Sequence, residues 1–338
     1  MADYTALLEA GREAVLLASS VTRQVQGAIE QVRAITKEDD SPVSVADYAA
    51  QAIVGRVLAD RLGGDVILVG EEDSSYLSDD THAAVLDAVL AAVREIDESI
   101  NEDQLLRAID VGAGDTHHAG FWTLDPIDGT KGFLRGQQYS IALAYIERGE
   151  PVVAALACPN LAIGFDHDVS QVDAEGSLYV AIKGDGAWES RCTPDAASAP
   201  TQLQRLDHDE GEAITVCTSV EAKHSNIART NTLMDEVAEP WDRLPIDSQC
   251  KYAVVARGQA DAYVRMPVRK TYIERIWDHA AGALIATEAG AGVSDMFGRP
   301  LDFGHGRGLE QNQGLIVAAP RVHAKLHAAM ESLGYGRD

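Results

Sequence analysis

The sequence predicts a chain of two mixed halves, an α+β half followed by an α/β half, with helices and sheets packed in layers. Its 338 residues, 46% apolar and 24% charged, are typical of a globular protein with one large domain or two ordinary ones. Strand-like runs follow one another between residues 121 and 184 without long helices between them, which favours an antiparallel sheet. Farther along, strand-like and helical segments alternate. We therefore divide the chain into residues 1–205 and 206–338.

In the first half, apolar residues recur at helical spacing over about 4–33, which predicts an N-terminal helix. Ser44 is expected to cap a second helix that ends near residue 62, and Thr81 a third that ends near residue 96. Runs rich in β-branched and aromatic residues predict strands at 66–70, 121–125, 139–147, 151–158 and 178–184.

In the second half, short apolar runs bounded by polar or glycine-containing segments alternate with helical patterns. The predicted strands are 214–219, 261–266 and 314–319, and the predicted helices are about 225–237, 278–289 and 321–333. Such alternation of strands and helices is typical of an α/β unit.

Composition and charge exclude several classes of function. The net charge of −25 opposes binding to nucleic acids and anionic membranes, so we expect neither as a partner. The four cysteines form no C-x-x-C pair, which favours a reducing compartment. The N-terminus carries early acids and no signal-peptide pattern, and the longest uncharged stretch, 151–165, is too short to span a bilayer. We expect a cytoplasmic protein, and a monomer.

Carboxylates stand where predicted strands end or helices start, and each has an ordinary structural explanation as a helix cap, a turn or a solvated loop. They are Asp47, Glu71, Glu72, Asp125, Asp128 and Asp278. Their combination is more informative, because Gly129 and Thr130 add backbone N–H groups that can cradle an anion. Oxygen ligands from separate segments suit Mg²⁺, which also binds substrate phosphate. These residues suggest a Mg²⁺-dependent phosphohydrolase.

Three spaced blocks, GEED (70–73), LDPIDGTKGF (124–133) and WDHAAG (277–282), resemble in the same order the signatures of the lithium-sensitive, Mg²⁺-dependent inositol monophosphatase superfamily. Within it, the chain is most similar to the 3′(2′),5′-bisphosphate nucleotidases, which hydrolyse 3′-phosphoadenosine 5′-phosphate to AMP. The segments SVADYAAQ, DGTKGFLRG, IDSQCKY, ADAYVRMP and PLDFGHGRGL fit that branch, and Gly132 replaces the asparagine typical of inositol monophosphatases. The resemblance covers about residue 39 to the end.

The resemblance implies a layered α-β-α-β-α sandwich and two or three Mg²⁺ ions. Its implied metal ligands are Glu71, Asp125, the carbonyl of Ile127, Asp128 and Asp278, with Glu72 nearby or on a third metal. It implies that Thr130 orients a nucleophilic water while Asp47 accepts a proton directly or through the Thr130 hydroxyl. The implied substrate contacts are Gly129, Thr130, His224, Ser248, Lys251, Arg265 and Asp278. In GEED, Asp73 replaces a residue that is often small and polar in relatives.

Lys251 and Arg265 are candidates to bind the second phosphate, although surface solubility would also explain two cations in an acidic chain. Three alternatives to a bisphosphate nucleotidase remain. One is a phosphatase of inositol phosphates, which would share the metal site. A second is a haloacid-dehalogenase-type phosphatase, although its D-x-D spacing differs from the D-x-x-D of Asp125 and Asp128. The third is a non-catalytic nucleotide sensor, which should lack Asp47, Thr130 or a metal ligand.

Overall fold

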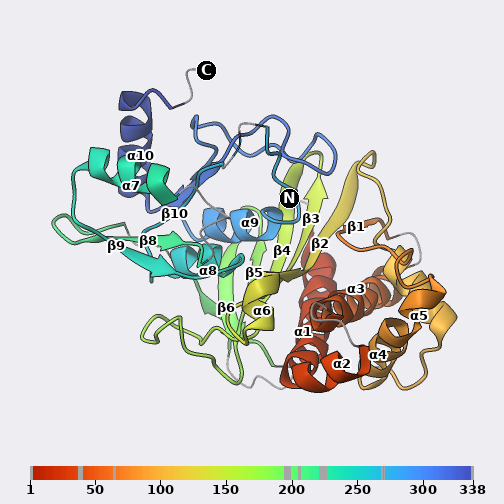
Figure 1. The fold of residues 1–338 in the computed structure, drawn as a ribbon. Helices are drawn as coiled ribbons and strands as arrows, with labels where there is room; N and C mark the ends of the chain where they lie inside the picture. Colours follow the sequence, from red (N-terminus) through yellow and green to blue (C-terminus); the bar gives the residue numbers. More distant parts are fainter. Residues whose placement is uncertain are drawn as a thin grey trace.

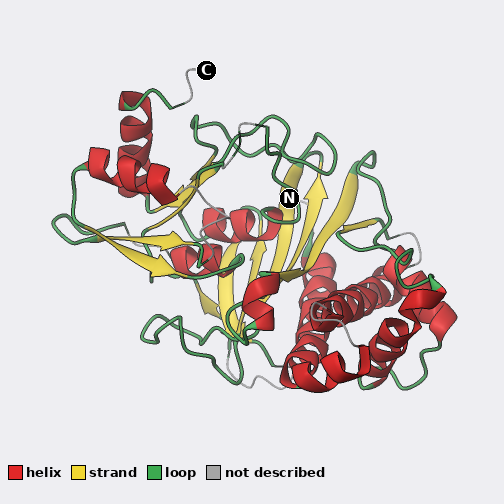
Figure 2. Ribbon diagram, viewed as in Figure 1, coloured by secondary structure: helices red, strands yellow, loops and turns green. Residues whose placement is uncertain are grey.

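The structure is a computed structural model, and it describes residues 3–36, 41–63, 66–193, 199–204, 207–220, 227–267, 269 and 271–335, with the side chains of 34–36 and 41–43 left out. Helices and two sheets alternate in five layers, from the helices α1–α5 at one side to α7 and α10 at the other (Figures 1 and 2). The predicted α-β-α-β-α sandwich is confirmed. The predicted boundary at 205–206 lies outside the described residues.

Within the described residues, the first sheet has seven strands in chain order, and only β1 pairs in parallel, with β2. The other pairs are antiparallel, as the closely spaced runs predict. On β3, Ile141 and Leu143 face the outer helices while Ala142 and Ala144 face the middle layer. The strands are β1(Leu68–Gly70), β2(Gly120–Asp128), β3(Ser140–Glu147), β4(Glu150–Cys158), β5(Ser177–Ile182), β6(Gly186–Arg191) and β7(Thr201–Gln202).

One layer of helices covers the outer face of this sheet, with α1 and α3 packed directly on it. The predicted N-terminal helix is interrupted at Ala28. Ser44 does not cap the second helix, because that helix begins at Ser41. Thr81 is not a cap either, since its backbone N–H donates to the capping Asp79. The elements are α1(Thr5–Gly27), α2(Ile29–Thr36), α3(Ser41–Leu62), the 3₁₀ turn η1(Asp80–His82), α4(Ala83–Arg94) and α5(Glu102–Asp110).

The middle layer consists of α8(Cys250–Ala256) and α9(Ala280–Glu288), which lie between the two sheets. Both helices are buried nearly all round, and the alanines of α9 allow the sheets to approach closely. Because α9 begins at Ala280 with His279 as its N-cap, Asp278 lies in the loop before the helix rather than at its predicted first position.

The second sheet has the order β11-β12-β10-β8-β9 within the described residues. Strand β8 is parallel to β9 and β10, whereas β12 is antiparallel to β10 and β11. Helices α7(Ile227–Val237) and α10(Pro320–Ser332) pack together, and α10 covers the outer face of the sheet. No helix in the described ranges is both long and apolar enough to cross a membrane. The strands are β8(Ile214–Thr218), β9(Trp241–Pro245), β10(Ala262–Arg265), β11(Gly292–Ser294) and β12(Leu315–Ala318).

Candidate active site

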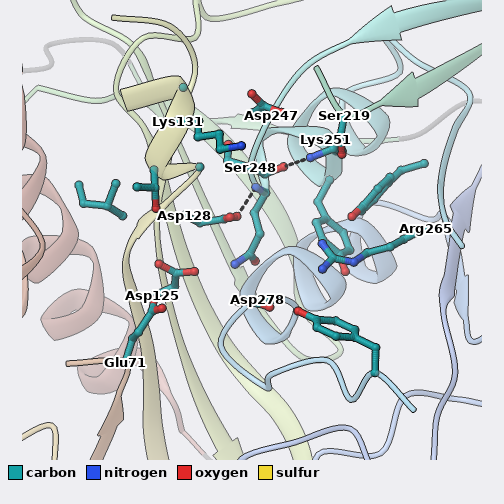
Figure 3. Close-up of a pocket in the computed structure, with 18 residues that line it drawn as sticks. Glu71, Asp125, Asp128, Lys131, Ser219, Asp247, Ser248, Lys251, Arg265 and Asp278 are labelled. Atoms are coloured by element: carbon teal, nitrogen blue, oxygen red, sulfur yellow. Dashed lines mark hydrogen bonds between the residues drawn. The ribbon is translucent and has the colours of Figure 1, made fainter. Parts of the chain in front are cut away.

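A cleft of about 320 Å³ opens between the end of β2 and the segments that carry α8, β10 and the loop before α9. Figure 3 shows Glu71 and Asp125 at one side of this cleft and Lys251 and Arg265 at the other, while Lys131 and Asp247 also line it. We call Glu71, Asp125, Asp128 and Asp278 the carboxylate end. We call Ser248, Lys251 and Arg265 the cationic end.

The two aspartates of strand β2 lie on either side of an irregularity in its pairing with β3. Asp125 pairs with Ala142 and Asp128 with Ser140, so the register shifts between them and the ladder contains a bulge. Pro126 lies inside this bulge and has no N–H to donate to a ladder. The buried Ile127 also lies there, so its backbone is released from regular pairing near the cleft that it lines.

Directly after β2, Gly129 turns the chain into the short helix α6(Thr130–Leu134). Its φ of +93° is a left-handed conformation that glycine adopts without strain. Thr130, the first residue of α6, is exposed in the cleft. Gly132 is required by space, because a Cβ there would lie 2.1 Å from the carbonyl oxygen of Gln138. An asparagine at position 132 would therefore force the neighbouring loop to move.

The parallel pairing of β1 with β2 brings Glu71 and Glu72, which follow β1, to the same edge as Asp125. The buried Gln51 of α3 holds this loop: its side-chain oxygen accepts the N–H of Glu72 at 3.1 Å and its amide donates to the Glu72 carbonyl. Asp47 lies one helical turn before Gln51, and therefore on the same face of α3. Burial, and then the charges of Glu72 and Glu71, raise the pKa of Asp47 well above its usual range.

Burial, and after it electrostatic repulsion, opposes ionisation of the carboxyl groups at the carboxylate end. Asp125 is only 3% exposed, and its Oδ1 is buried without a hydrogen-bond partner among the described residues. Burial, followed by the charges of Glu71, Asp128, Asp278 and Asp47, raises the pKa of Asp125 well above its usual range. Burial and neighbouring carboxylates likewise raise the pKa of Glu71 to about 7.

The pKa of Asp128 is raised to about 6, by burial first and by Asp278 second, although Lys251 opposes the shift. A bound cation would relieve this repulsion and satisfy the unpaired oxygen of Asp125. The donor set consists of carboxylate oxygens, which are the ligands that hard cations such as Mg²⁺ prefer. The residues therefore fit a metal site.

At the cationic end the charges are supported by protein partners. Lys251 is 4% exposed, and its Nζ donates to the carbonyl of Ser248 at 3.0 Å and lies 5.2 Å from the ring centre of Tyr263. Ser248 adopts a φ of +64°, a conformation that costs free energy for a residue with a side chain and is common at functional sites. Arg265, at the end of β10, forms an ion pair with Glu274.

The structure gathers most of the residues predicted for the site around one cleft. Asp47 and Glu72 lie beside Glu71 and do not line the cleft. Asp47 and Thr130 both belong to the described residues, and no direct hydrogen bond joins them. His224 lies outside the described residues. The predicted residues that line the cleft are Glu71, Asp125, Ile127, Asp128, Gly129, Thr130, Ser248, Lys251, Arg265 and Asp278. Their roles stay predictions.

Gln249 is a cleft residue that the sequence analysis missed. Its backbone N–H donates to Oδ2 of Asp128. The side chain of Gln249 is buried, and its amide donates to the carbonyl of Trp277 at 2.8 Å while its oxygen accepts the N–H of Gly282 at 2.9 Å. These two partners stand on either side of Asp278 in the sequence. Gln249 thus ties the two halves of the carboxylate end together. The segment IDSQCKY contained it, but nothing in the local pattern distinguishes this glutamine from a surface residue.

Comparisons with known proteins agree with the resemblance. Residues 39–334 match the model of the inositol monophosphatase family. A 3′(2′),5′-bisphosphate nucleotidase of Schizosaccharomyces pombe is 38% identical over 337 residues, which cover 96% of this chain and 94% of the relative. A 3′(2′),5′-bisphosphate nucleotidase 1 of Arabidopsis thaliana is 39% identical, covering 85% of this chain and 84% of the relative.

Among solved structures, CysQ from Bacteroides thetaiotaomicron, described as a bacterial member of the inositol monophosphatase family, superimposes with a TM-score of 0.62. The match covers 94% of this chain and 98% of that one at 20% identity, so this likeness concerns the fold alone.

Proposed function

The chain belongs to the inositol monophosphatase family, and on this premise we propose that it hydrolyses the 3′-phosphate of 3′-phosphoadenosine 5′-phosphate to give AMP and phosphate, with Mg²⁺ as its cofactor. The predicted family, and with it a phosphatase, is confirmed. The family match also argues against the haloacid-dehalogenase alternative.

The observation that carries the substrate proposal is that Lys251 and Arg265 lie across the cleft from Glu71 and Asp125 (Figure 3). A carboxylate end suits a metal-bound scissile phosphate, whereas a phosphate at the far end needs fixed cations. Lys251 and Arg265 supply these cations in a chain whose net charge is −25. An inositol monophosphate has no second phosphate to use them. The names of the relatives add independent support.

The side chains of the carboxylate end, with the carbonyl of Ile127, would hold Mg²⁺. When bound, Mg²⁺ neutralises charge on the scissile phosphate and lowers the pKa of a bound water. In the proposed mechanism, Thr130 orients the attacking water through its hydroxyl, and Asp47 takes up the proton that the water loses. In the metal-free protein, burial and then the charges of Glu72 and Glu71 raise the pKa of Asp47, which favours proton uptake by its carboxylate.

As the water oxygen bonds to phosphorus, the bond from phosphorus to the 3′-oxygen breaks, and the alkoxide that leaves takes a proton from solvent water to become the 3′-hydroxyl of AMP. Ser248, Lys251 and Arg265 hold the 5′-phosphate during this step. No covalent enzyme intermediate is involved. Single-turnover hydrolysis in H₂¹⁸O should therefore place the label in the released phosphate and none in the protein, whereas a trapped phospho-aspartate at Asp125 would contradict the mechanism.

The substrate proposal is tested by measuring phosphate release from 3′-phosphoadenosine 5′-phosphate, AMP, inositol 1-phosphate and inositol 1,4-bisphosphate, each with Mg²⁺ and with EDTA. We expect the first substrate to give the highest kcat/KM, and EDTA to abolish turnover. A preference for either inositol phosphate would favour the alternative of an inositol phosphate phosphatase. Binding of the nucleotide without any turnover would favour a sensor.

A further inference from the structure

Arg265 is held at the cationic end by a second, buried residue. Its Nε donates to Oε1 of Glu274 at 2.8 Å, and its Nη2 lies 2.7 Å from Oε2 of the same carboxylate. This two-point contact fixes the plane of the guanidinium group. Glu274 is 6% exposed, whereas the Arg265 side chain is 21% exposed and lines the cleft. Figure 3 shows Arg265 on the same side of the cleft as Lys251.

Glu274 is itself held in place by a chain of buried groups. Nε2 of His279 lies 3.3 Å from Oε2 of Glu274, and Nδ1 of the same ring lies 2.8 Å from the hydroxyl of Tyr252. Both His279 and Tyr252 are 1% exposed. Tyr252 follows Lys251 on α8, and His279 follows Asp278. The chain therefore connects the support of Arg265 to both ends of the cleft.

These residues also resemble a metal site, since ligand atoms of Glu274, Asp278 and His279 lie within 4.8 Å of one another. The hydrogen bonds argue against that interpretation. Both oxygens of Glu274 contact Arg265, and both ring nitrogens of His279 have a partner. A metal would have to displace an arginine from a buried carboxylate, which leaves the guanidinium unpaired.

We propose that Glu274 is a positioning residue for substrate specificity, which orients Arg265 toward the 5′-phosphate through the chain Tyr252–His279–Glu274. The inference rests on the proposed function, because it assigns Arg265 to that phosphate. A free arginine loses side-chain entropy when it binds a phosphate, and an arginine fixed beforehand loses less. Burial alone would raise the pKa of Glu274, but the hydrogen bonds and charges of His279 and Arg265 together lower it.

The test is Glu274→Gln, compared on 3′-phosphoadenosine 5′-phosphate and on 3′-AMP, which lacks the 5′-phosphate, at saturating Mg²⁺. We expect KM for the bisphosphate to rise about tenfold with kcat within about twofold, and KM for 3′-AMP to stay within about twofold. The matched control is Glu189→Gln. Glu189 is about as buried as Glu274, and its Oε1 lies 3.3 Å from Nη1 of Arg257. Neither Glu189 nor Arg257 lines the cleft. This control should leave the ratio of the two KM values unchanged.

A second variant covers the case in which Glu274→Gln does not fold. Tyr252→Phe removes only the hydroxyl that holds His279, and we expect a shift in the KM ratio of about two- to fivefold in the same direction. Calorimetric titration should show weaker binding of AMP and unchanged binding of adenosine in either variant. The role of Glu274 would be overturned if KM rose equally for both substrates, or if the ratio of the two KM values stayed unchanged in every folded variant. If the unmodified protein does not hydrolyse the bisphosphate at all, the proposed function fails first and the inference falls with it.

Discussion

At the carboxylate end of the cleft, Asp125, Glu71 and Asp128 repel one another, and Oδ1 of Asp125 has no partner among the described residues. At the cationic end, Arg265 is paired with Glu274 and Lys251 donates to the carbonyl of Ser248. Burial and like charge oppose ionisation at the carboxylate end, whereas protein partners already hold the side chains of the cationic end. Under the proposed function, this difference separates two tasks: the carboxylate end would bind the metal, and the cationic end would recognise the 5′-phosphate.

The largest expected effect is at the carboxylate end. Asp125→Asn removes ligand charge from its centre, and we expect Mg²⁺-dependent kcat to fall by about 10³-fold or more. In the metal-free protein the same change should raise Tm by roughly 1–3 °C, because it removes a buried charge that like charges oppose. Activity assays and calorimetric melting with EDTA measure the two effects.

Asp295→Asn is the matched control for melting. Asp295 is fully buried like Asp125, but its Oδ1 accepts the N–H groups of Phe297 and Arg299 at 2.9 Å each. We expect this control to lower Tm. A fall in Tm for metal-free Asp125→Asn as well would show that the carboxylate end is not under electrostatic strain.

The second-largest expected effect follows from removing the hydroxyl of Thr130. Thr130→Ala should lower kcat by roughly 10²-fold, the usual contribution of one group in proton transfer, and leave KM within about twofold. Thr130→Ser, which keeps a hydroxyl, should recover most of the rate. Because Thr130 is exposed, Tm should not change in either variant. A large rise in KM for the alanine variant would instead assign Thr130 to substrate binding.

At the cationic end, Arg265→Ala should raise KM for 3′-phosphoadenosine 5′-phosphate by about 10- to 100-fold and leave the Mg²⁺ requirement unchanged. Unlike Asp125→Asn, it should lower Tm, since Glu274 loses its charged partner while buried. Steady-state kinetics over a series of Mg²⁺ concentrations, with melting in parallel, test both expectations. Arg61 is exposed, does not line the cleft and pairs with a partly exposed carboxylate, Glu13, so Arg61→Ala is the control variant.

The smallest expected effect concerns pH. Burial and neighbouring carboxylates raise the pKa of Glu71 to about 7 and of Asp128 to about 6, so the folded metal-free protein binds these protons more tightly than the unfolded chain. Their contribution to the free energy of unfolding is therefore full below about pH 4 and is lost as the pH rises toward 7. Since Mg²⁺ binds the ionised carboxylates, we expect its stabilising shift in Tm to be about 3 °C larger at pH 8 than at pH 5.5.

His323 acts in the opposite direction, because burial and His327 lower its pKa to about 4. Its contribution should cancel when melting with and without Mg²⁺ is compared at each pH. A shift in Tm that is independent of pH would mean that the carboxylates of the metal-free protein are already ionised at pH 5.5.

Much of the site could be predicted because its acidic residues come in contiguous blocks. Asp125 and Asp128 follow an apolar run and enclose a proline, so one short segment of the sequence predicts the strand, the turn and the ligands.

The helix ends were less predictable. Ser44 and Thr81 have good capping side chains, but the helix near Ser44 begins at Ser41, and at Thr81 the competing carboxylate of Asp79 takes the capping position. The capping propensity of a single residue does not account for a neighbouring side chain, such as Asp79, that competes for the same position.

The sequence by itself determined the layered fold, the family and the identity of the candidate ligands, because alternating apolar patterns and short motifs are local properties of the chain. Only the tertiary structure decided how those ligands are held. Gln51 binds the loop of Glu72, Gln249 joins Asp128 to the segment around Asp278, and Glu274 orients Arg265. The contacts of Gln51 with Glu72 and of Gln249 with Asp128 and Trp277 join residues more than 20 positions apart. All of these contacts depend on burial, which fixes polar side chains by denying them water as an alternative partner.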